Sequence, residues 1–232
     1  MRFIEKQAEP PLLRKWRWDN SGLPQTLGYA NIPADALAEL RETLLREQGY
    51  LCAYTMIRAP SSNRVHVEHI WSRPHAPTKE LEYTNMVYCF PGAGAERCAF
   101  GAHRKDDFEV TNDNFVAPTH RACEARFAYE VSGEVKASSE VDYAATRTVT
   151  ILNLNHKELV ALRQAAIRSQ RIFRKAAKPL SAPEARKLAV DVMQRDGTGM
   201  IAPFCVAIKQ VAERFAAQRE ARSAGIARNP AT

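Results

Sequence analysis

Long apolar runs are missing from this sequence. The longest nearly apolar stretch, Met200–Ile208, is far shorter than the roughly 20 residues that a membrane-spanning helix needs, so a membrane protein is not expected. The first residues carry charges and the prolines Pro10 and Pro11 where a secretory signal would need an apolar core. We therefore expect a cytoplasmic protein in a reducing compartment.

Cysteine is scarce, and both sequence repeats and a nucleotide-binding loop are absent. The five cysteines form an odd number, which favours free thiols or metal ligands over a disulfide framework. No G-x-x-x-x-G-K-[ST] phosphate loop is present, so ATP binding by that route is not expected. No repeat of roughly 20 to 50 residues is visible, which excludes a solenoid or a propeller.

The sequence does have an excess of positive charge. Of its 232 residues 45% are apolar, enough for the packed core of one or two domains. Its 33 lysines and arginines outnumber its 26 aspartates and glutamates, which gives a net charge of +7. This surplus predicts attraction to polyanions such as nucleic acid.

One stretch, Lys157–Lys187, carries a surplus of basic residues equal to that of the whole chain. At helical spacing these side chains either form the solvated face of an amphipathic helix or contact a phosphate backbone. Under the second interpretation, the nucleic-acid-binding residues are Arg163, Arg168, Arg171, Arg174, Lys175 and Lys178.

The chain divides into three zones by composition. Residues 1–49 form an irregular arm and a helix, residues 50–110 concentrate cysteine and histidine, and residues 111–232 are mainly helical with a basic face. Within the second zone, Tyr50–Ile57 and Val65–Ile70 read as two short strands or a loose hairpin, and a helix carrying Asn85 is expected after Thr84. In the third zone, two pairs have the spacing of a helix cap, Asn155 with Glu158 and Ser181 with Glu184.

The second zone holds most of the residues that could perform chemistry. Each has an ordinary explanation alone, but packing does not require so many in so short a stretch. They are Cys52, His66, Glu68, His69, His75, Asn85, Cys89, Cys98 and His103.

The adjacent pair Glu68 and His69 is the centre of this group. Neighbouring side chains on a strand point to opposite sides, so the carboxylate can hold a divalent cation while the imidazole takes a proton from water. The carbonyl oxygen of Asn85 could then fix the imidazole tautomer. We expect a second metal ligand in His103, or failing it in Asp106 or Asp107.

These residues resemble the HNH, or ββα-metal, nuclease motif. The likeness lies in Cys52–Thr55, Val67–Ile70, Asn85–Cys89, Cys98 and His103–Lys105. Flanking segments are similar to the PtuB-type HNH proteins, the nuclease components of Septu and some retron anti-phage systems. Those segments are Met1–Leu13, Leu45–Cys52, Phe127–Gly133 and Ile151–Asn155, and the resemblance covers about residues 1 to 170.

The resemblance implies an α+β fold, with a small ββα-metal nuclease core at residues 50–110 inside a mainly α-helical frame. It implies that His69 is the general base, that Asn85 orients it, and that Glu68 and His103 bind one catalytic ion, Mg²⁺ or Mn²⁺ or else Zn²⁺. The expected reaction is hydrolysis of phosphodiester bonds in DNA, with a separate PtuA-like ATPase as partner. Retron-linked relatives suggest RNA, notably tRNA, as the alternative substrate.

The sequence departs from that family at Thr55, where a second cysteine of a Cys-x-x-Cys pair is usual. A four-cysteine zinc site is therefore excluded. Cys52, Cys89 and Cys98 remain for a structural Zn²⁺ whose fourth ligand would be His66 or His75, and the absence of any zinc is the alternative. The same departure keeps open a third hypothesis, a catalytically silent module that binds nucleic acid or a partner protein.

Overall fold

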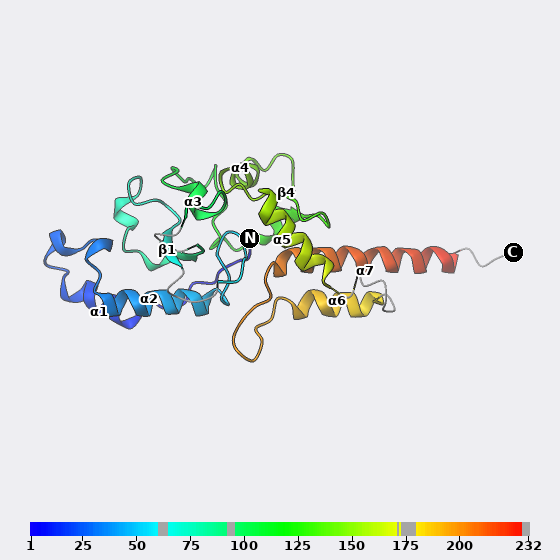
Figure 1. Ribbon diagram of the computed structural model, residues 1–232, viewed down its shortest axis with the longest axis horizontal. Coiled ribbons are helices and arrows are strands. Elements are labelled where there is room, and N and C mark those ends of the chain that lie inside the picture. The colour runs from blue at the N-terminus through cyan, green and yellow to red at the C-terminus, as the bar shows by residue number, and fades with distance from the viewer. Residues whose placement is uncertain (60–64, 92–95, 171, 173–179, 229–232) are drawn as a thin grey trace.

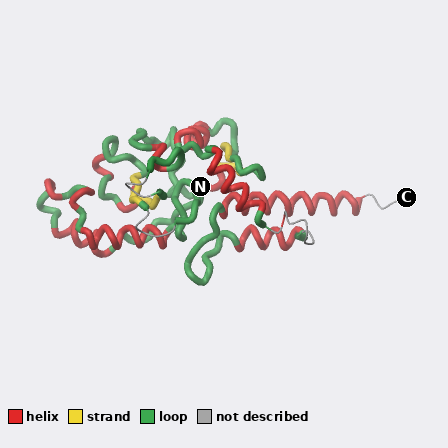
Figure 2. The backbone as a smooth tube through the Cα atoms, viewed as in Figure 1, coloured by secondary structure: helices red, strands yellow, loops and turns green. Residues whose placement is uncertain are grey.

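The protein has a mixed α and β fold with short strands and much irregular chain (Figure 2). The computed structural model describes residues 1–59, 65–91, 96–170, 172 and 180–228. The helices of this part are α1 (Pro11–Asp19), α2 (Ala34–Glu47), α3 (Ala102–Lys105), α4 (Tyr143–Ile151), α5 (Lys157–Arg168), α6 (Ala182–Asp191) and α7 (Cys205–Arg228).

The described strands form two small antiparallel sheets. One joins β1 (His66–His69) to β2 (Met86–Cys89), and the other joins β3 (Phe127–Tyr129) to β4 (Val135–Ala137). In the first sheet Glu68 lies opposite Val87 and His69 opposite Met86. Because side chains alternate along a strand, Glu68 and His69 lie on opposite faces of this sheet, as predicted.

Two of the predicted elements of the second zone are wrong. Residues 50–57 form no strand, because the chain makes a tight turn in which the Met56 amide donates to the Cys52 carbonyl at 3.0 Å and Met56 has a φ of 61°. The partner of β1 is instead β2. No helix starts after Thr84 either, since Asn85 is the last residue of a short 3-10 helix, Tyr83–Asn85, that runs directly into β2.

The β1–β2 sheet has an apolar cluster on each face. Val67, Met86 and Tyr88 pack with Leu40 and Leu44 of α2, while Val87 and Cys89 belong to the larger core on the other face. In Figure 1, α1 and α2 lie at one end of the molecule, beside this sheet. His69 is therefore on the α2 face, and Glu68 faces the larger core.

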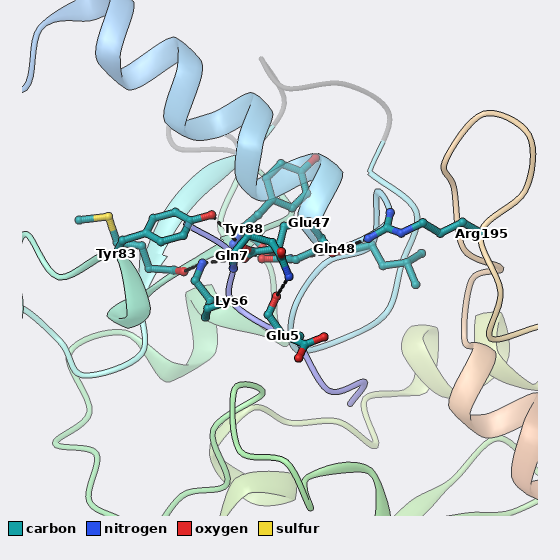
Figure 3. A network of polar contacts seen from close by, with 10 residues as sticks. Glu5, Lys6, Gln7, Glu47, Gln48, Tyr83, Tyr88 and Arg195 are labelled. Carbon is teal, nitrogen blue, oxygen red and sulfur yellow. Dashed lines mark hydrogen bonds and ion pairs between the residues drawn. The ribbon is translucent and has the colours of Figure 1, made fainter. Parts of the chain in front are cut away.

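A buried polar network ties the N-terminal arm to the end of α2 (Figure 3). The Lys6 ammonium is 2.7 Å from a carboxylate oxygen of Glu47 and 3.0 Å from the Met86 carbonyl. The other oxygen of Glu47 accepts from the Gln7 amide at 2.7 Å and from the Tyr83 hydroxyl at 2.9 Å. Each of these partners donates a hydrogen bond to the buried Glu47 carboxylate. Because Lys6 also donates to Met86, the N-terminal arm is fixed against the start of β2.

The C-terminal helices form a frame and an arm. Figure 1 shows α6 beside the first part of α7, which extends away from the rest of the molecule. The predicted capping box of Ser181 and Glu184 at the start of α6 is confirmed. The one predicted for α5 is wrong, because the Asn155 side chain instead bonds the amide and carbonyl of Val135, at 2.9 and 2.8 Å.

Asp142, at the start of α4, offers a first test of the packing described here. It caps α4 by accepting from the Ala145 amide at 2.9 Å, and it accepts from the Arg126 guanidinium at 2.7 and 2.5 Å. Asp142→Ala should lower the free energy of unfolding at pH 7 by about 1–2 kcal/mol in urea titrations. Asp19→Ala, which removes only an exposed pair with Lys15, should change it by less than about 1 kcal/mol.

The contribution of Asp142 should also depend on pH. The Arg126 guanidinium lowers the pKa of Asp142 below its ordinary value of 3.8. The stabilisation is therefore present above 3.8 and is lost as pH falls through the lower pKa of the folded state. We expect the difference in the free energy of unfolding between wild type and Asp142→Ala to become smaller below that pH. A difference that stays constant would contradict the ion pair of Asp142 with Arg126.

Candidate active site

A cleft of about 330 Å³ lies beside β1 and is lined from α2, from β1 and the loop after it, and from the end of α3. Its charged and titratable lining includes Arg41, Glu68, His69, Arg73 and Lys105. Both members of the predicted Glu68–His69 pair reach this cleft although they lie on opposite faces of the sheet. It is therefore the place where the two groups could act on one molecule.

His69 is held in one orientation by main-chain and aromatic contacts. Its Nε2 is 2.9 Å from the Glu80 carbonyl oxygen, and its ring meets the Tyr29 ring edge-on at 4.9 Å. Because a carbonyl only accepts, Nε2 carries the proton and Nδ1 keeps its lone pair. Burial lowers the pKa of His69, which keeps the ring neutral near pH 7. The arrangement is that of a general base.

The Asn85 side chain bonds the loop after β1 and not the imidazole of His69, which corrects the contact predicted from the sequence. Its carbonyl oxygen accepts from the Trp71 amide at 2.8 Å, and its amide donates to the carbonyls of Trp71 and Lys79 at 3.0 and 3.1 Å. These bonds join both ends of the loop 71–79, and the next residue is Glu80, whose carbonyl holds His69. We therefore expect Asn85 to position His69 through this loop.

Asn85→Ala should therefore change the imidazole as well as the stability. Losing three buried hydrogen bonds should lower the free energy of unfolding by about 2–3 kcal/mol. The Nε2-protonated tautomer of His69, visible in the ¹⁵N NMR shifts of the ring, should give way to a mixture. Asn114→Ala is the matched control, because Asn114 ties together a loop at residues 109–114. An unchanged His69 tautomer in Asn85→Ala would contradict the positioning role.

Glu68 lies on the other face with cationic neighbours. One carboxylate oxygen is 2.8 Å from the Lys105 ammonium and 3.4 Å from the Tyr54 hydroxyl, and the other is 3.6 Å from His66 Nε2. Burial opposes ionisation, but the contacts with His66 and Lys105 prevail and hold the pKa of Glu68 below its usual range. Glu68 is therefore a carboxylate.

The sequence analysis selected His66 only as a candidate zinc ligand and did not place it beside Glu68. Its Nδ1 is 2.7 Å from the Pro91 carbonyl, so Nδ1 carries a proton and Nε2 is the atom that faces Glu68. Although burial opposes it, the Glu68 carboxylate raises the pKa of His66. The signal was available in the sequence, because His66 is two residues before Glu68 and hence on the same face of the strand.

The predicted metal ligand His103 lies beside His66 and stacks on it, with ring centroids 5.4 Å apart. Its Nδ1 accepts from the Cys98 amide at 3.1 Å, so the proton of the neutral ring is on Nε2. Asp106, the fallback ligand, pairs with Arg97. Within the described residues no three His, Cys, Asp or Glu side chains are grouped to hold a metal ion.

Two atoms that could bind a metal ion nevertheless face each other, a carboxylate oxygen of Glu68 and the Nε2 of His66. This pair fits a small divalent cation such as Mg²⁺ or Mn²⁺, because such ions keep several water ligands and take the remainder from substrate phosphates. The place beside the other Glu68 oxygen belongs to Lys105. Glu68 and His66 are therefore the two residues whose ligand atoms face each other, and a metal-binding role for His103 stays a prediction.

The cysteines chosen as structural zinc ligands lie in the same region. Cys52 and Cys89 are buried, and Cys98 is partly exposed. Burial opposes thiolate formation, yet hydrogen bonds from Cys89 and Thr55 lower the pKa of Cys52 to about 6. Thr55 thus occupies a place beside Cys52 that a metal-binding thiol could have taken. The structural zinc stays a prediction.

The predicted basic face needs one correction. Arg163 is 1% exposed, because its guanidinium donates to the carbonyls of Gly133 and Leu154, so it cannot contact nucleic acid. Arg168 is exposed at the end of α5. The other predicted contacts, Arg171, Arg174, Lys175 and Lys178, lie outside the described residues.

Two arginines in the cleft were not selected from the sequence. Arg73 is 3.7 Å from a Glu80 carboxylate oxygen, and its guanidinium lies 5.2 Å from the centre of the Tyr29 ring. Arg41 of α2 lines the same cleft and has a buried Nε without a hydrogen-bond partner. Both lie on the side of the cleft that carries His69, where an anionic substrate would need them.

Comparisons with known proteins give no assignment for the chain. No protein-family model matches it, and no curated protein matches it either. Among the described residues there is no helix with the length and apolar character needed to cross a membrane. The function must therefore be argued from the cleft itself.

Proposed function

We propose that the protein is an HNH-type endonuclease that hydrolyses phosphodiester bonds. The observation that carries the proposal is His69, whose Nε2–H is held by the Glu80 carbonyl, so that the lone pair of the neutral ring is on Nδ1. The cleft beside it is lined by Arg41, Arg73 and Lys105 and by the acidic Glu68, Asp106 and Asp107. A buried histidine with only a structural role has no need of such a cleft. The carboxylate of Glu68 reaches the same space from the opposite face of β1.

In the proposed reaction, Nδ1 of His69 removes a proton from a water molecule, which attacks phosphorus as the 3′ oxygen leaves. The Glu80 carbonyl stabilises the imidazolium that results, since it already accepts from the other ring nitrogen. Glu68 and His66 would hold a divalent cation, which when bound supplies positive charge for the phosphate oxygens. Arg41 and Arg73 bind the phosphates next to the one that is cut. The products carry 5′-phosphate and 3′-hydroxyl ends.

DNA is the substrate that we propose, with the protein acting as the cytoplasmic effector of an anti-phage system beside a PtuA-like ATPase. The net charge of +7 and the arginines of the cleft support a polyanionic substrate. The arginines would bind phosphate groups, which DNA and RNA share. RNA cleavage and binding without cleavage are therefore alternative outcomes of the same assay.

The test is a cleavage assay on plasmid DNA, single-stranded DNA and total tRNA. Purified protein is incubated with Mg²⁺, with Mn²⁺ or with chelator, alone and with a co-encoded ATPase where one exists. We expect plasmid DNA to be cleaved in the presence of Mg²⁺ or Mn²⁺ and to stay intact with chelator. Loss of tRNA alone would replace DNA by RNA as the substrate. If none of the three polymers is cut, even with the ATPase present, the proposal is wrong and the protein is a binding module.

A further inference from the structure

A lysine is buried against the carboxylate that we propose as the metal ligand. The Lys105 side chain is 1% exposed, and its ammonium is 2.8 Å from Glu68. Lysine is almost never fully buried unless it is paired, so this contact accounts for its position. Lys105 is the last residue of α3 and lines the cleft. The next two residues, Asp106 and Asp107, are acidic and line the cleft as well.

The ammonium places a positive charge beside the carboxylate that a divalent cation would bind. One oxygen of Glu68 contacts Lys105 and Tyr54, and the other faces His66. A cation that binds this carboxylate at close range meets the positive charge of Lys105 at a few ångströms, where like charges repel strongly in a buried setting. That repulsion favours movement of the ammonium away from Glu68 when a cation binds at the oxygen that faces His66.

We propose that Lys105 is an internal cation that neutralises Glu68 until a divalent metal ion displaces it. The inference rests on the proposed metal site at Glu68 and His66. The long flexible stem of lysine allows its ammonium to leave the carboxylate. The Asp106 carbonyl is already 3.3 Å from Nζ, and Asp106 and Asp107 line the cleft into which the ammonium would swing. Metal binding then transfers a positive charge from Glu68 to the cleft.

An exclusively structural role explains the pair less well. A buried ion pair is often no more stabilising than apolar residues of the same size, so stability alone gives little reason for one beside a cleft. The pair of Lys6 and Glu47 provides the contrast. It is similarly short, at 2.7 Å, but its carboxylate is surrounded by donors of the N-terminal arm and has no histidine opposite it.

The test measures Mn²⁺ binding by calorimetry, without any cleavage. Lys105→Met keeps the length of the side chain and removes its charge, and it should bind Mn²⁺ at least about tenfold more tightly than wild type, a change of roughly 1.4 kcal/mol. Lys105→Arg keeps the charge and should stay near the wild-type affinity. Lys6→Met removes the lysine that pairs with the buried Glu47 and should leave the Mn²⁺ affinity unchanged.

A second measurement uses the unaltered protein in case Lys105→Met does not fold. Lysines are acetylated with a water-soluble reagent and quantified by mass spectrometry, with and without saturating Mn²⁺. Displacement should raise the labelling of Lys105 several-fold while that of Lys6 stays constant. Equal labelling of Lys105 in both conditions would overturn the proposal.

The outcomes separate this inference from the proposed function. If Lys105→Met binds Mn²⁺ as tightly as wild type or more weakly, the proposed displacement of Lys105 by the metal ion is wrong, even if the wild type cleaves DNA. Tighter binding supports it, even if no cleavage is found and the nuclease proposal fails. No Mn²⁺ binding by wild type or by Lys105→Met removes the metal site and with it the displacement.

Discussion

His69→Ala is expected to lower the rate of phosphodiester cleavage by about 10²–10⁴-fold, the usual contribution of a general base. The loss should be in kcat, because the ring is proposed to act on water and not to bind the phosphate. Binding of nucleic acid by folded His69→Ala should stay near wild type, since Arg41 and Arg73 remain in the cleft. Rates are measured on a fluorescently labelled duplex, and affinities by anisotropy in the presence of chelator.

His120→Ala is the matched control for this variant. His120 is an exposed histidine on a turn, and its Nδ1 accepts from the nearby Ala122 amide at 3.2 Å. It should cleave at the wild-type rate. Cleavage by His69→Ala at the wild-type rate would mean that the base is another residue, and unchanged metal-dependent cleavage by both His69→Ala and Glu68→Ala would exclude the mechanism altogether.

The opposite placement of Glu68 and His69 could be predicted from the sequence because it depends only on the two-residue period of a strand. The same period puts His66 on the face of Glu68, so this neighbour could have been found. The partner of the strand could not, since the pairing of β1 with β2 depends on contacts between segments about twenty residues apart. The tight turn at Cys52–Met56 removed the hairpin that local β propensity favoured.

The hydrogen-bond partner of His69 was beyond reach of any motif. It is the main-chain oxygen of Glu80, and every residue other than proline offers the same main-chain groups, so the amino-acid type carries no signal. Asn85 was predicted to contact His69 directly, but its side chain instead bonds the loop that leads to Glu80. Its role becomes visible only when the loop between Trp71 and Lys79 is folded around it.

Charge was the least reliable guide to exposure. Lys105 and Arg163 are both nearly inaccessible, although lysine and arginine are mostly exposed in proteins. In each case the partner is distant in sequence: Glu68 for Lys105, and the Gly133 carbonyl for Arg163. Helical periodicity shows which face of a helix a residue occupies, but it does not show whether acceptors from another element cover that face.

Arg163→Leu should be the most destabilising of the substitutions considered, at about 3–5 kcal/mol in the free energy of unfolding. The guanidinium of α5 donates to the carbonyls of Gly133 and Leu154, at the turn between β3 and β4 and just before α5. Leucine would leave both acceptors buried without a partner. Because domains of this kind are stable by only about 5–15 kcal/mol, urea unfolding should show a large shift.

The same variant decides whether Arg163 belongs to a nucleic-acid surface. Arg168 is exposed one turn further along α5, so Arg168→Leu removes an equal charge and should change the stability by less than about 0.5 kcal/mol. Folded Arg163→Leu, at low temperature, should bind duplex DNA as tightly as wild type, since its guanidinium is directed into the protein. A weaker affinity with unchanged stability would restore the surface role, because only an accessible guanidinium can contact a phosphate while contributing nothing to the core.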